Sequence, residues 1–391
     1  MTASTMPISF DDIRMLATAR LPGPVLSIVL RTDPRDPANT RHTPAWQISL
    51  RTALQDIGEV LERDGSREQR LALRELAPAV QRELAELPAD RRGRGLAWFV
   101  TADRSLDRRH VLQLPPSGDV VRWDARPYVV PLIEVVDRGQ PVVIVLVASD
   151  SVRLVRWEQG QATEPVRSVY DLELGDWRDY AAYAAANPAR GQQTVTNVEA
   201  YEQRVDAWRQ RFYRATGAAI ADRLAELEVS RVLIAGERGL TQAFAELVPS
   251  ELGRDVLADA AENLIRADAA AVAERVEARI IAVRSAEARR AAEDAVHAAR
   301  AGRPAALGPD ETLQALAASR VERLVIDPAN VFPVARLGSA AARTLRRPED
   351  DMVAECAVEL AVASGAKITA VEVRNAPALA EAGGMAATLR Y

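Results

Sequence analysis

The sequence predicts a protein of the α/β class with three domains. Apolar runs of strand length alternate along the chain with longer segments in which apolar residues recur every three or four positions. At roughly 100–200 residues per domain, a chain of 391 residues favours two to four domains. New units begin near residue 127 and after residue 302. We therefore predict domains at residues 1–126, 127–302 and 303–391.

The first domain is expected to combine helices with a sheet. Leu50, Leu54, Ile57 and Leu61 recur at spacings of three and four, which indicates an amphipathic helix. A turn-rich stretch at residues 32–40 and a polar break at 88–95 separate the elements. The expected elements are a helix at 10–18, a strand at 25–30, helices at 44–63 and 66–87, and strands at 96–101, 110–114 and 120–123.

The second domain is expected to open with a β-hairpin. A β-branched run at residues 142–148 is followed by the turn Ser149-Asp150-Ser151 and a return strand at 152–156. A polar segment with aromatic residues extends from 171 to 196. A long helix is expected to begin near Asn197, capped by Thr196 or Asn197, and to end near residue 227. A strand at 232–235 and a helix at 241–247 continue the alternation.

Residues 257–302 are rich in alanine, glutamate and arginine, a composition that predicts a pair of solvated helices between two domains. The last domain is expected to contain a helix at 311–318, a strand at 323–326, a helix at 351–363 and a strand at 367–373. This order predicts a small α/β/α sandwich.

The composition excludes several classes of protein. One cysteine excludes a disulfide framework, and three dispersed histidines argue against a metal centre, so we expect no metal. Cys356 lies in an apolar helical stretch and is expected in the core. The net charge of −5 argues against a global positive field that would hold nucleic acid, although local basic patches remain open. The longest apolar runs are too short to cross a bilayer, which predicts a soluble, cytoplasmic protein.

Common catalytic motifs are absent from the sequence: it has no Walker A loop, no GxSxG, no HExxH and no GxGxxG after a strand. One loop stands apart. The stretch Ala-Asn-Pro-Ala-Arg-Gly-Gln-Gln-Thr-Val at residues 186–195 lies between the aromatic segment and the long helix.

In this loop the chain resembles the archaeo-eukaryotic class I release factor superfamily, which includes Pelota and bacterial homologues. Catalytic members carry a Gly-Gly-Gln loop just before a long helix of the middle domain, usually after an arginine and before a small hydroxyl residue. Arg190, Gly191, Gln193 and Thr194 match that arrangement, and Gln192 replaces the middle glycine. Further likeness to the superfamily extends over residues 25–39, 127–134, 313–317, 321–326 and 358–371.

The resemblance implies a middle domain with an RNase H-like mixed sheet and a C-terminal α/β/α domain of the release-factor third-domain type. It also implies that the ribosome is the partner: the protein would enter the ribosomal A site and hydrolyse the peptidyl-tRNA ester. The resemblance implies no cofactor and no binding to a membrane or to DNA. The third domain would dock a translational GTPase of the elongation factor Tu type. No stop-codon-reading tetrapeptide of the true termination factors is evident, which favours rescue or quality control.

The resemblance assigns catalysis to Gly191, Gln192 and Gln193. Arginine binds phosphate in a planar fork, and aromatic rings can stack on bases, so residues near the loop and in the N-terminal turn are candidates for contact with ribosomal RNA. These candidates are Arg190, Thr194, Trp177, Tyr180, Arg35 and Arg41. Packing of Trp177 and Tyr180 on the middle domain, and an ordinary connection at residues 186–195, remain open alternatives.

Gln192 leaves two functions open. If the loop works with glutamine at its middle position, the protein is a peptidyl-tRNA hydrolase. If it does not, the protein is a non-hydrolytic hibernation factor of the Balon kind, which occupies the A site of idle ribosomes.

Overall fold

A computed structural model describes residues 7–165, 168–171, 194–227, 229–247, 253–258, 264–329, 332–345 and 352–391. The chain forms two compact units. Unit 1 joins Met1–Gln140 to Ile281–Tyr391, and unit 2 is Pro141–Ile280. Within unit 1 we distinguish an N-terminal module, residues 7–140, from a C-terminal module, residues 281–391, each with its own sheet.

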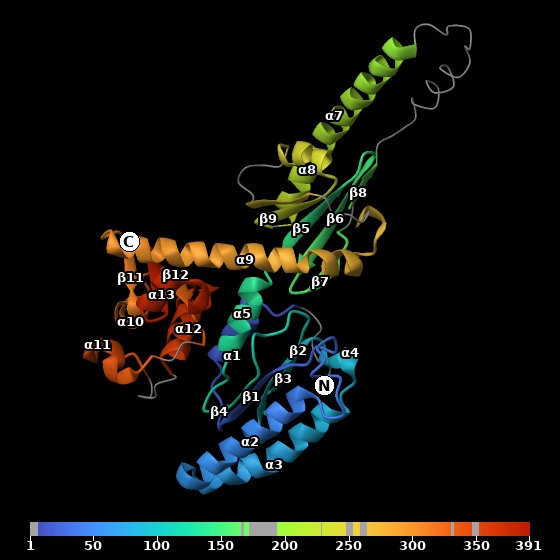
Figure 1. The fold of residues 1–391 in the computed structure, drawn as a ribbon. Coiled ribbons are helices and arrows are strands. Elements are labelled where there is room, and N and C mark those ends of the chain that lie inside the picture. Colours follow the sequence, from blue (N-terminus) through green and yellow to red (C-terminus); the bar gives the residue numbers. More distant parts are fainter. Residues whose placement is uncertain are drawn as a thin grey trace. The chain divides into compact units, whose positions relative to one another are not determined.

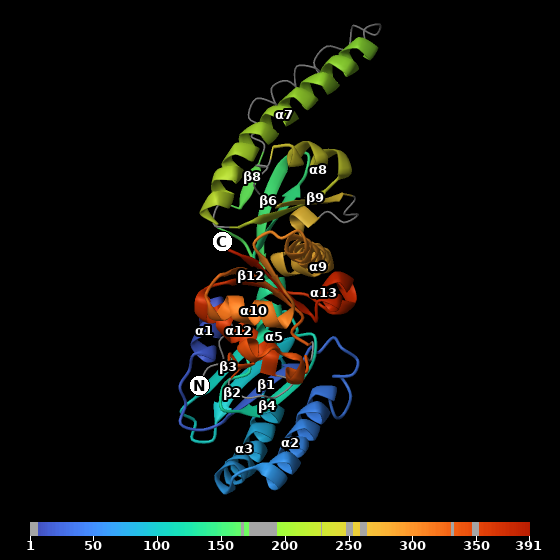
Figure 2. The same cartoon turned by 90° about the vertical axis from the view of Figure 1, so that its left-hand side faces the viewer.

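The N-terminal module contains an antiparallel sheet in the order β3-β2-β1-β4 (Figure 1). Its strands are β1 (Val25–Arg31), β2 (Gly95–Thr101), β3 (Asp107–Leu112) and β4 (Val120–Asp124). Helices α2 (Ala45–Asp64) and α3 (Arg67–Glu86) lie side by side on one face, over Leu26, Ile28 and Leu30 (Figure 2). Helices α1 (Phe10–Ala17) and α5 (Val130–Arg138) contribute to the core on the other face. The short α4 (Ala89–Arg92) precedes β2.

The C-terminal module contains a sheet in the order β11-β14-β12-β13, in which only β12 and β13 are parallel. The strands are β11 (Ala305–Leu307), β12 (Val321–Ile326), β13 (Lys367–Ala370) and β14 (Met385–Leu389). Helices α10 (Gly308–Ala317) and α12 (Met352–Ser364) share a core with one face. The second half of α9 (Ala269–Arg300) and α13 (Pro377–Glu381) share a core with the other face. The predicted α/β/α sandwich is confirmed.

Smaller elements complete the C-terminal module: η2 (Val334–Arg336), α11 (Ser339–Ala342) and η3 (Val373–Asn375). One apolar core runs through both modules of unit 1. It joins Ile13 of α1 and Ile133 of α5 to Leu313 of α10 and Val358 of α12. The N-terminal and C-terminal modules are therefore packed together, although the 140 residues of unit 2 separate them in sequence.

Unit 2 contains a mixed sheet in the order β10-β9-β5-β6-β7, with β8 paired to β6. The strands are β5 (Val142–Val147), β6 (Ser151–Glu158), β7 (Gln161–Thr163), β8 (Val169–Asp171), β9 (Arg231–Gly236) and β10 (Gly253–Ala258). The first three strands form antiparallel hairpins, and β9 and β10 add in parallel through helical crossovers. This order is the RNase H-like mixed sheet expected for the middle domain.

Helices cover both faces of this sheet. Helix α7 (Thr194–Glu226), the long yellow-green helix of Figure 1, shares a core with α8 (Arg238–Ala245) and one face of the sheet. The first half of α9 packs on the other face through Val272, Val276 and Ile280, after the short η1 (Leu264–Arg266). Helix α7 begins at Thr194, three residues before the predicted start.

The prediction of a solvated helical pair at residues 257–302 is wrong. The segment contains the end of β10, η1 and the single helix α9. Ala288, Ala292 and Ala295 are buried at spacings of four and three against the C-terminal sheet. Alanine gives a weak periodic signal because its side chain is small, and the interspersed charged residues mask the stripe. Cys356 is buried in α12, as predicted.

Candidate functional site

The predicted loop lies directly before helix α7. Thr194 is the first residue of that helix, so the run from Arg190 to Gln193 ends where α7 begins. Arg190, Gly191, Gln192 and Gln193 lie outside the described residues, as do Trp177 and Tyr180. Their assignments remain predictions, and so does that of Thr194.

The second half of α7 anchors the helix to the sheet of unit 2. Tyr213 is buried and donates a hydrogen bond of 2.8 Å from its hydroxyl to the carbonyl oxygen of Ala148, at the end of β5. Its ring packs edge to face against Phe244 of α8, with the ring centres 6.0 Å apart. Ile220 and Leu224 continue the buried stripe further along the helix. The direction of α7 relative to the sheet is therefore fixed by its second half.

The same end of the sheet depends on a close approach of two strands. Gly236, the last residue of β9, has a φ of +150°. A Cβ atom at this position would lie 2.3 Å from the carbonyl oxygen of Val147 in β5. Only glycine fits here, because any side chain would collide with backbone.

A pocket of about 670 Å³ opens beside the turn between β5 and β6. Its walls are residues 148–151, Arg153, Glu164, Val169 and residues 265–268. Arg153 is buried, and its guanidinium donates to the carbonyl oxygens of Ile265 and Ala267 and to the carboxylate of Glu164. Through these bonds, Arg153 links β6 to the segment before α9.

In unit 1, the two arginines predicted to contact RNA differ in their surroundings. Arg35 donates from Nε and Nη2 to the carboxylate of Asp33, at 3.1 and 3.0 Å. Asp33 also accepts from Nε of Arg94 at 2.9 Å. Burial opposes ionisation of Asp33, but the hydrogen bonds from Arg35 and Arg94 lower its pKa to about 2. Arg35 therefore helps to hold its loop together.

Arg41 lies further along the same loop and is exposed. Within the described residues it forms no ion pair. Hydrogen bonds from a side chain to the backbone link parts of this loop: the side-chain amide of Asn39 donates to the carbonyl oxygens of Arg31 and Asp33, both at 3.1 Å. Arg41 is thus an exposed cation on a loop that the hydrogen bonds of Asn39 help to hold.

Helix α4 lies next to this loop, in the segment 88–95 that was predicted as a polar break. The hydroxyl of Thr32 donates to the carbonyl oxygen of Arg92 at 3.2 Å, and the guanidinium of Arg92 lies 5.1 Å from the centre of the Trp46 ring. The neighbouring Arg91 is exposed and, among the described residues, has no ion-pair partner. The sequence does contain a signal for a basic surface in this segment, because residues 88–94 include three arginines and one aspartate.

We call the exposed surface formed by residues 31–44 and 88–94 the arginine surface. It contains six arginines and three aspartates, although the chain as a whole has a net charge of −5. Two of the aspartates are engaged by arginines of the same surface: Asp33 as above, and Asp36 at 3.7 Å from Arg31. A surface of this kind attracts anions in a salt-dependent way.

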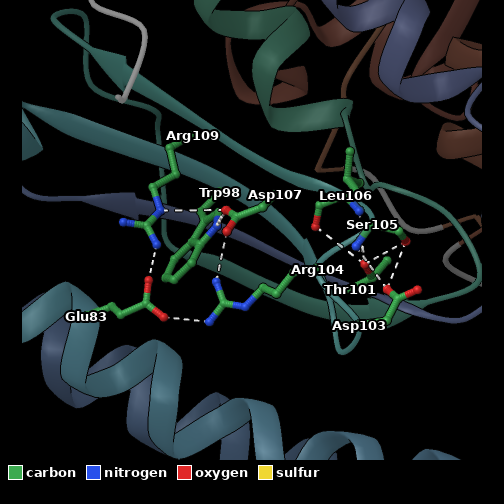
Figure 3. A network of polar contacts seen from close by, with 9 residues as sticks. All are labelled: Glu83, Trp98, Thr101, Asp103, Arg104, Ser105, Leu106, Asp107 and Arg109. Atoms are coloured by element: carbon green, nitrogen blue, oxygen red, sulfur yellow. Dashed lines mark hydrogen bonds and ion pairs between the residues drawn. The ribbon is translucent and has the colours of Figure 1, made fainter. Parts of the chain in front are cut away.

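In a second polar cluster of the N-terminal module, the charged side chains pair with one another (Figure 3). Trp98 of β2 donates from its indole nitrogen to Asp107 at 2.7 Å. Arg104 and Arg109 flank the indole ring, and Glu83 of α3 pairs with both. Because each charge in the cluster has a partner, we assign it to the attachment of α3 to the sheet.

No group of metal-ligating side chains occurs in the part of the chain that the structure describes. Among the same residues, none of the helices has the length and apolar character needed to cross a membrane.

Comparison with known proteins gives one family match. Residues 127–281 match the family described as bacterial archaeo-eukaryotic release factor family 10. This segment contains α5, the whole of unit 2 and the predicted loop. No curated protein sequence gives a significant match.

Solved structures with related folds include translation factors. The crystal structure of the archaeal translation termination factor aRF1 is 18% identical, with a TM-score of 0.24, over 98% of this chain and 99% of that one. Ribosome-bound archaeal Pelota with ABCE1 is 11% identical, with a TM-score of 0.41, over 100% and 95%. Pelota from Archaeoglobus fulgidus is 13% identical, with a TM-score of 0.34, over 99% and 93%.

At these TM-scores the assignment rests on the family model and not on superposition of whole chains. Over residues 127–281, less than half of its length, the chain is therefore similar to a bacterial family of archaeo-eukaryotic release factors.

Proposed function

We propose that the protein enters the A site of stalled ribosomes and releases the nascent chain by hydrolysing the peptidyl-tRNA ester, without reading a stop codon. The observation that carries this proposal is the position of the Arg-Gly-Gln-Gln-Thr run at residues 190–194, inside the family match and directly before α7. Such a factor works in the cytoplasm, in ribosome rescue or quality control.

The chemistry needs little acid–base machinery from the protein. Gly191 allows the backbone a positive φ and a close approach to RNA. A backbone N–H directed at the leaving 3′ oxygen stabilises the negative charge that develops there, and loss of one such donor typically costs about 2.7–4 kcal/mol. Gln193 cannot act as a general base, so its role is to position water and to exclude further solvent. Arg190 and Thr194, with Trp177 and Tyr180, would hold the loop against ribosomal RNA.

The arginine surface supports the binding half of the proposal. Arg41 and Arg91 are exposed cations without ion-pair partners in the described chain, and they are suited to the phosphates of small-subunit RNA. Arg35 would contribute indirectly, because its guanidinium is engaged by Asp33. We assign the region 303–391 to the docking of a translational GTPase of the elongation factor Tu type, and residues 127–302 to the peptidyl transferase centre.

A second function is favoured by Gln192. A residue with a Cβ atom at the middle position costs roughly 1–3 kcal/mol if the loop there needs glycine's backbone angles, and it can misdirect the N–H. A factor that binds without hydrolysis would act as a hibernation factor of the Balon kind.

Release of labelled peptide from stalled ribosome complexes separates the two functions. For a hydrolase, the wild-type protein releases peptide, Gln193→Ala does not, and both co-sediment with ribosomes equally. If neither protein releases peptide although both bind, hibernation is supported and hydrolysis is excluded. If both release peptide equally, the role of Gln193 is wrong.

A further inference from the structure

Strand β13 forms one edge of the C-terminal sheet, next to β12. The N–H of Val371 donates to the carbonyl oxygen of Ile326, on the β12 side, at 2.9 Å. Successive N–H groups of a strand point to opposite sides within the plane of the sheet. The N–H of Ala370 therefore points away from β12, beyond the edge of the sheet. An open edge of this kind is a template for unwanted strand pairing unless another element covers it.

Helix α5 of the N-terminal module covers this edge. Oδ2 of Asp137, in its last turn, accepts the N–H of Ala370 at 3.0 Å. The two residues are 233 positions apart in sequence, and their bond joins the N-terminal module to the C-terminal module. Around it, Ile133 and Val136 of α5 belong to the core that both modules share.

The largest charge interactions of Asp137 are with three arginines, which lie on three elements. They are Arg138 of α5, Arg284 of α9 and Arg323 of β12. Each of these has other partners: Arg138 pairs with Glu134 at 2.5 Å, Arg284 with Glu287 at 3.4 Å, and Arg323 donates to the hydroxyl of Thr369 at 3.5 Å.

Two further elements packed against α5, the helices α12 and α1, carry carboxylates that pair with arginines. On α12, Glu359 lies 3.5 Å from Arg126. On α1, Asp11 pairs with Arg14 at 3.0 Å. Strand β13 itself offers Asp137 a backbone N–H, and its exposed Lys367 lies at the opposite end of the strand.

Burial of Asp137 outweighs these cations. It raises the pKa of the carboxyl group from 3.8 to about 6, although the Ala370 N–H and the arginines act in the opposite direction. The neutral acid is therefore the form better suited to the closed position. Either form can accept the hydrogen bond of Ala370 through an oxygen atom.

We propose that Asp137 is a proton-sensitive clasp that holds α5 on the open edge of the C-terminal sheet and thereby fastens the two modules of unit 1. When the clasp opens, the carboxyl group returns to water and to its ordinary pKa, so closing takes up a proton. The clasp is firmest below pH 3.8 and weakens as the pH rises through about 6.

Amide hydrogen exchange in the full-length protein tests this clasp, with two neighbouring reporters. Local opening of α5 exposes the N–H of Ala370 and leaves that of Val371 bonded to β12. After correction for intrinsic exchange rates, the protection of Ala370 relative to Val371 should fall about tenfold between pH 5 and pH 7.5, from the two pKa values. Protein labelled with ¹⁵N in alanine and valine gives both signals by NMR.

Two variants give the control. Asp137→Asn keeps an oxygen acceptor but cannot titrate, so its ratio should not change with pH. Asp137→Ala loses the acceptor, so Ala370 should exchange rapidly at both pH values. A constant ratio in the wild-type protein, or the same pH dependence in Asp137→Asn, would overturn the proposal.

Discussion

The guanidinium carbon of Arg109 lies 3.7 Å from the centre of the Trp98 ring, and the indole nitrogen of Trp98 donates to Asp107. The contact is a cation–π pair on the face of the N-terminal sheet that α2 and α3 cover, where the adjacent carboxylates offset the charge of the arginine. Glu83 of α3 pairs with Arg109 of β3 and so extends the cluster from the sheet to the helix (Figure 3).

Removing the charge of Glu83 should loosen α3. Glu83→Gln leaves Arg104 and Arg109 without their helix partner, and because the groups are partly exposed we expect a loss of about 1–2 kcal/mol in unfolding free energy. Denaturant titration measures this loss. Asp11→Asn is the matched control, since its pair with Arg14 is well exposed and should be worth less than about 0.5 kcal/mol. Equal effects of the two variants would show that the cluster adds nothing.

His110 should make stability fall in acid. It is buried in β3, and burial lowers its pKa, although Asp12 nearby acts to raise it. A lowered folded-state pKa means that the contribution of neutral His110 is complete above its unfolded pKa of about 6.5. That contribution is lost as the pH falls through the folded-state value.

Protonation of Asp137 adds stability as the pH falls, which is opposite to the effect of His110 and occurs over an overlapping pH range. The test therefore uses Asp137→Asn as its background. Unfolding free energies of Asp137→Asn and of Asp137→Asn with His110→Gln are compared between pH 7.5 and pH 5. We expect the background protein to lose stability relative to the double variant as the pH falls. Parallel curves would contradict the assignment to His110.

Exposed arginines of the arginine surface should govern ribosome association. Reversing the charge of Arg41 or Arg91 should weaken co-sedimentation with ribosomes and lower the slope of log K against log salt by about 1 for each phosphate that the variant no longer binds. Arg82→Glu makes the same change of charge on the exposed side of α3 and serves as the control. If all three variants bind alike, the arginine surface does not contact RNA.

Gly236→Ala should strongly destabilise unit 2. The new Cβ atom would lie 2.3 Å from the carbonyl oxygen of Val147, at a backbone φ of +150°, so β5 and β9 must separate. We expect a loss of at least about 2–3 kcal/mol in thermal or denaturant unfolding. Gly239→Ala, three residues later in α8, meets nothing within 4 Å and should be neutral or stabilising by up to about 1 kcal/mol. A tolerated Gly236→Ala would show that the strands can move apart freely.

Much of the N-terminal module was predictable, because β1 and β2 are apolar runs and the helices have a strong periodic stripe. Predicted and observed bounds of α1, α2, α3, β1 and β2 agree within a residue. Strands β11 and β14 were missed: alanines among their residues weaken the pattern, and each is short. Helix α9 was misinterpreted for the related reason that alanine forms much of its buried stripe.

Contacts between distant residues could not be predicted from patterns of short period. Nothing in the sequence near Asp137 indicates Ala370, and nothing near Arg41 indicates that α4 lies against the same loop. The Gly191–Gln193 run was found by its likeness to a family. Its spacing before a helix gave no independent physical signal, and its function stays a prediction.

Cys356 is the single cysteine of the chain, and its sulfur is enclosed in α12 against the carbonyl oxygen of Thr344 at 3.3 Å. A thiol in this position is shielded from oxidants and from maleimide reagents. The wild-type chain therefore offers a chemically silent background. A cysteine introduced at Arg41 would carry a fluorophore at that position alone, with no need to remove the native thiol.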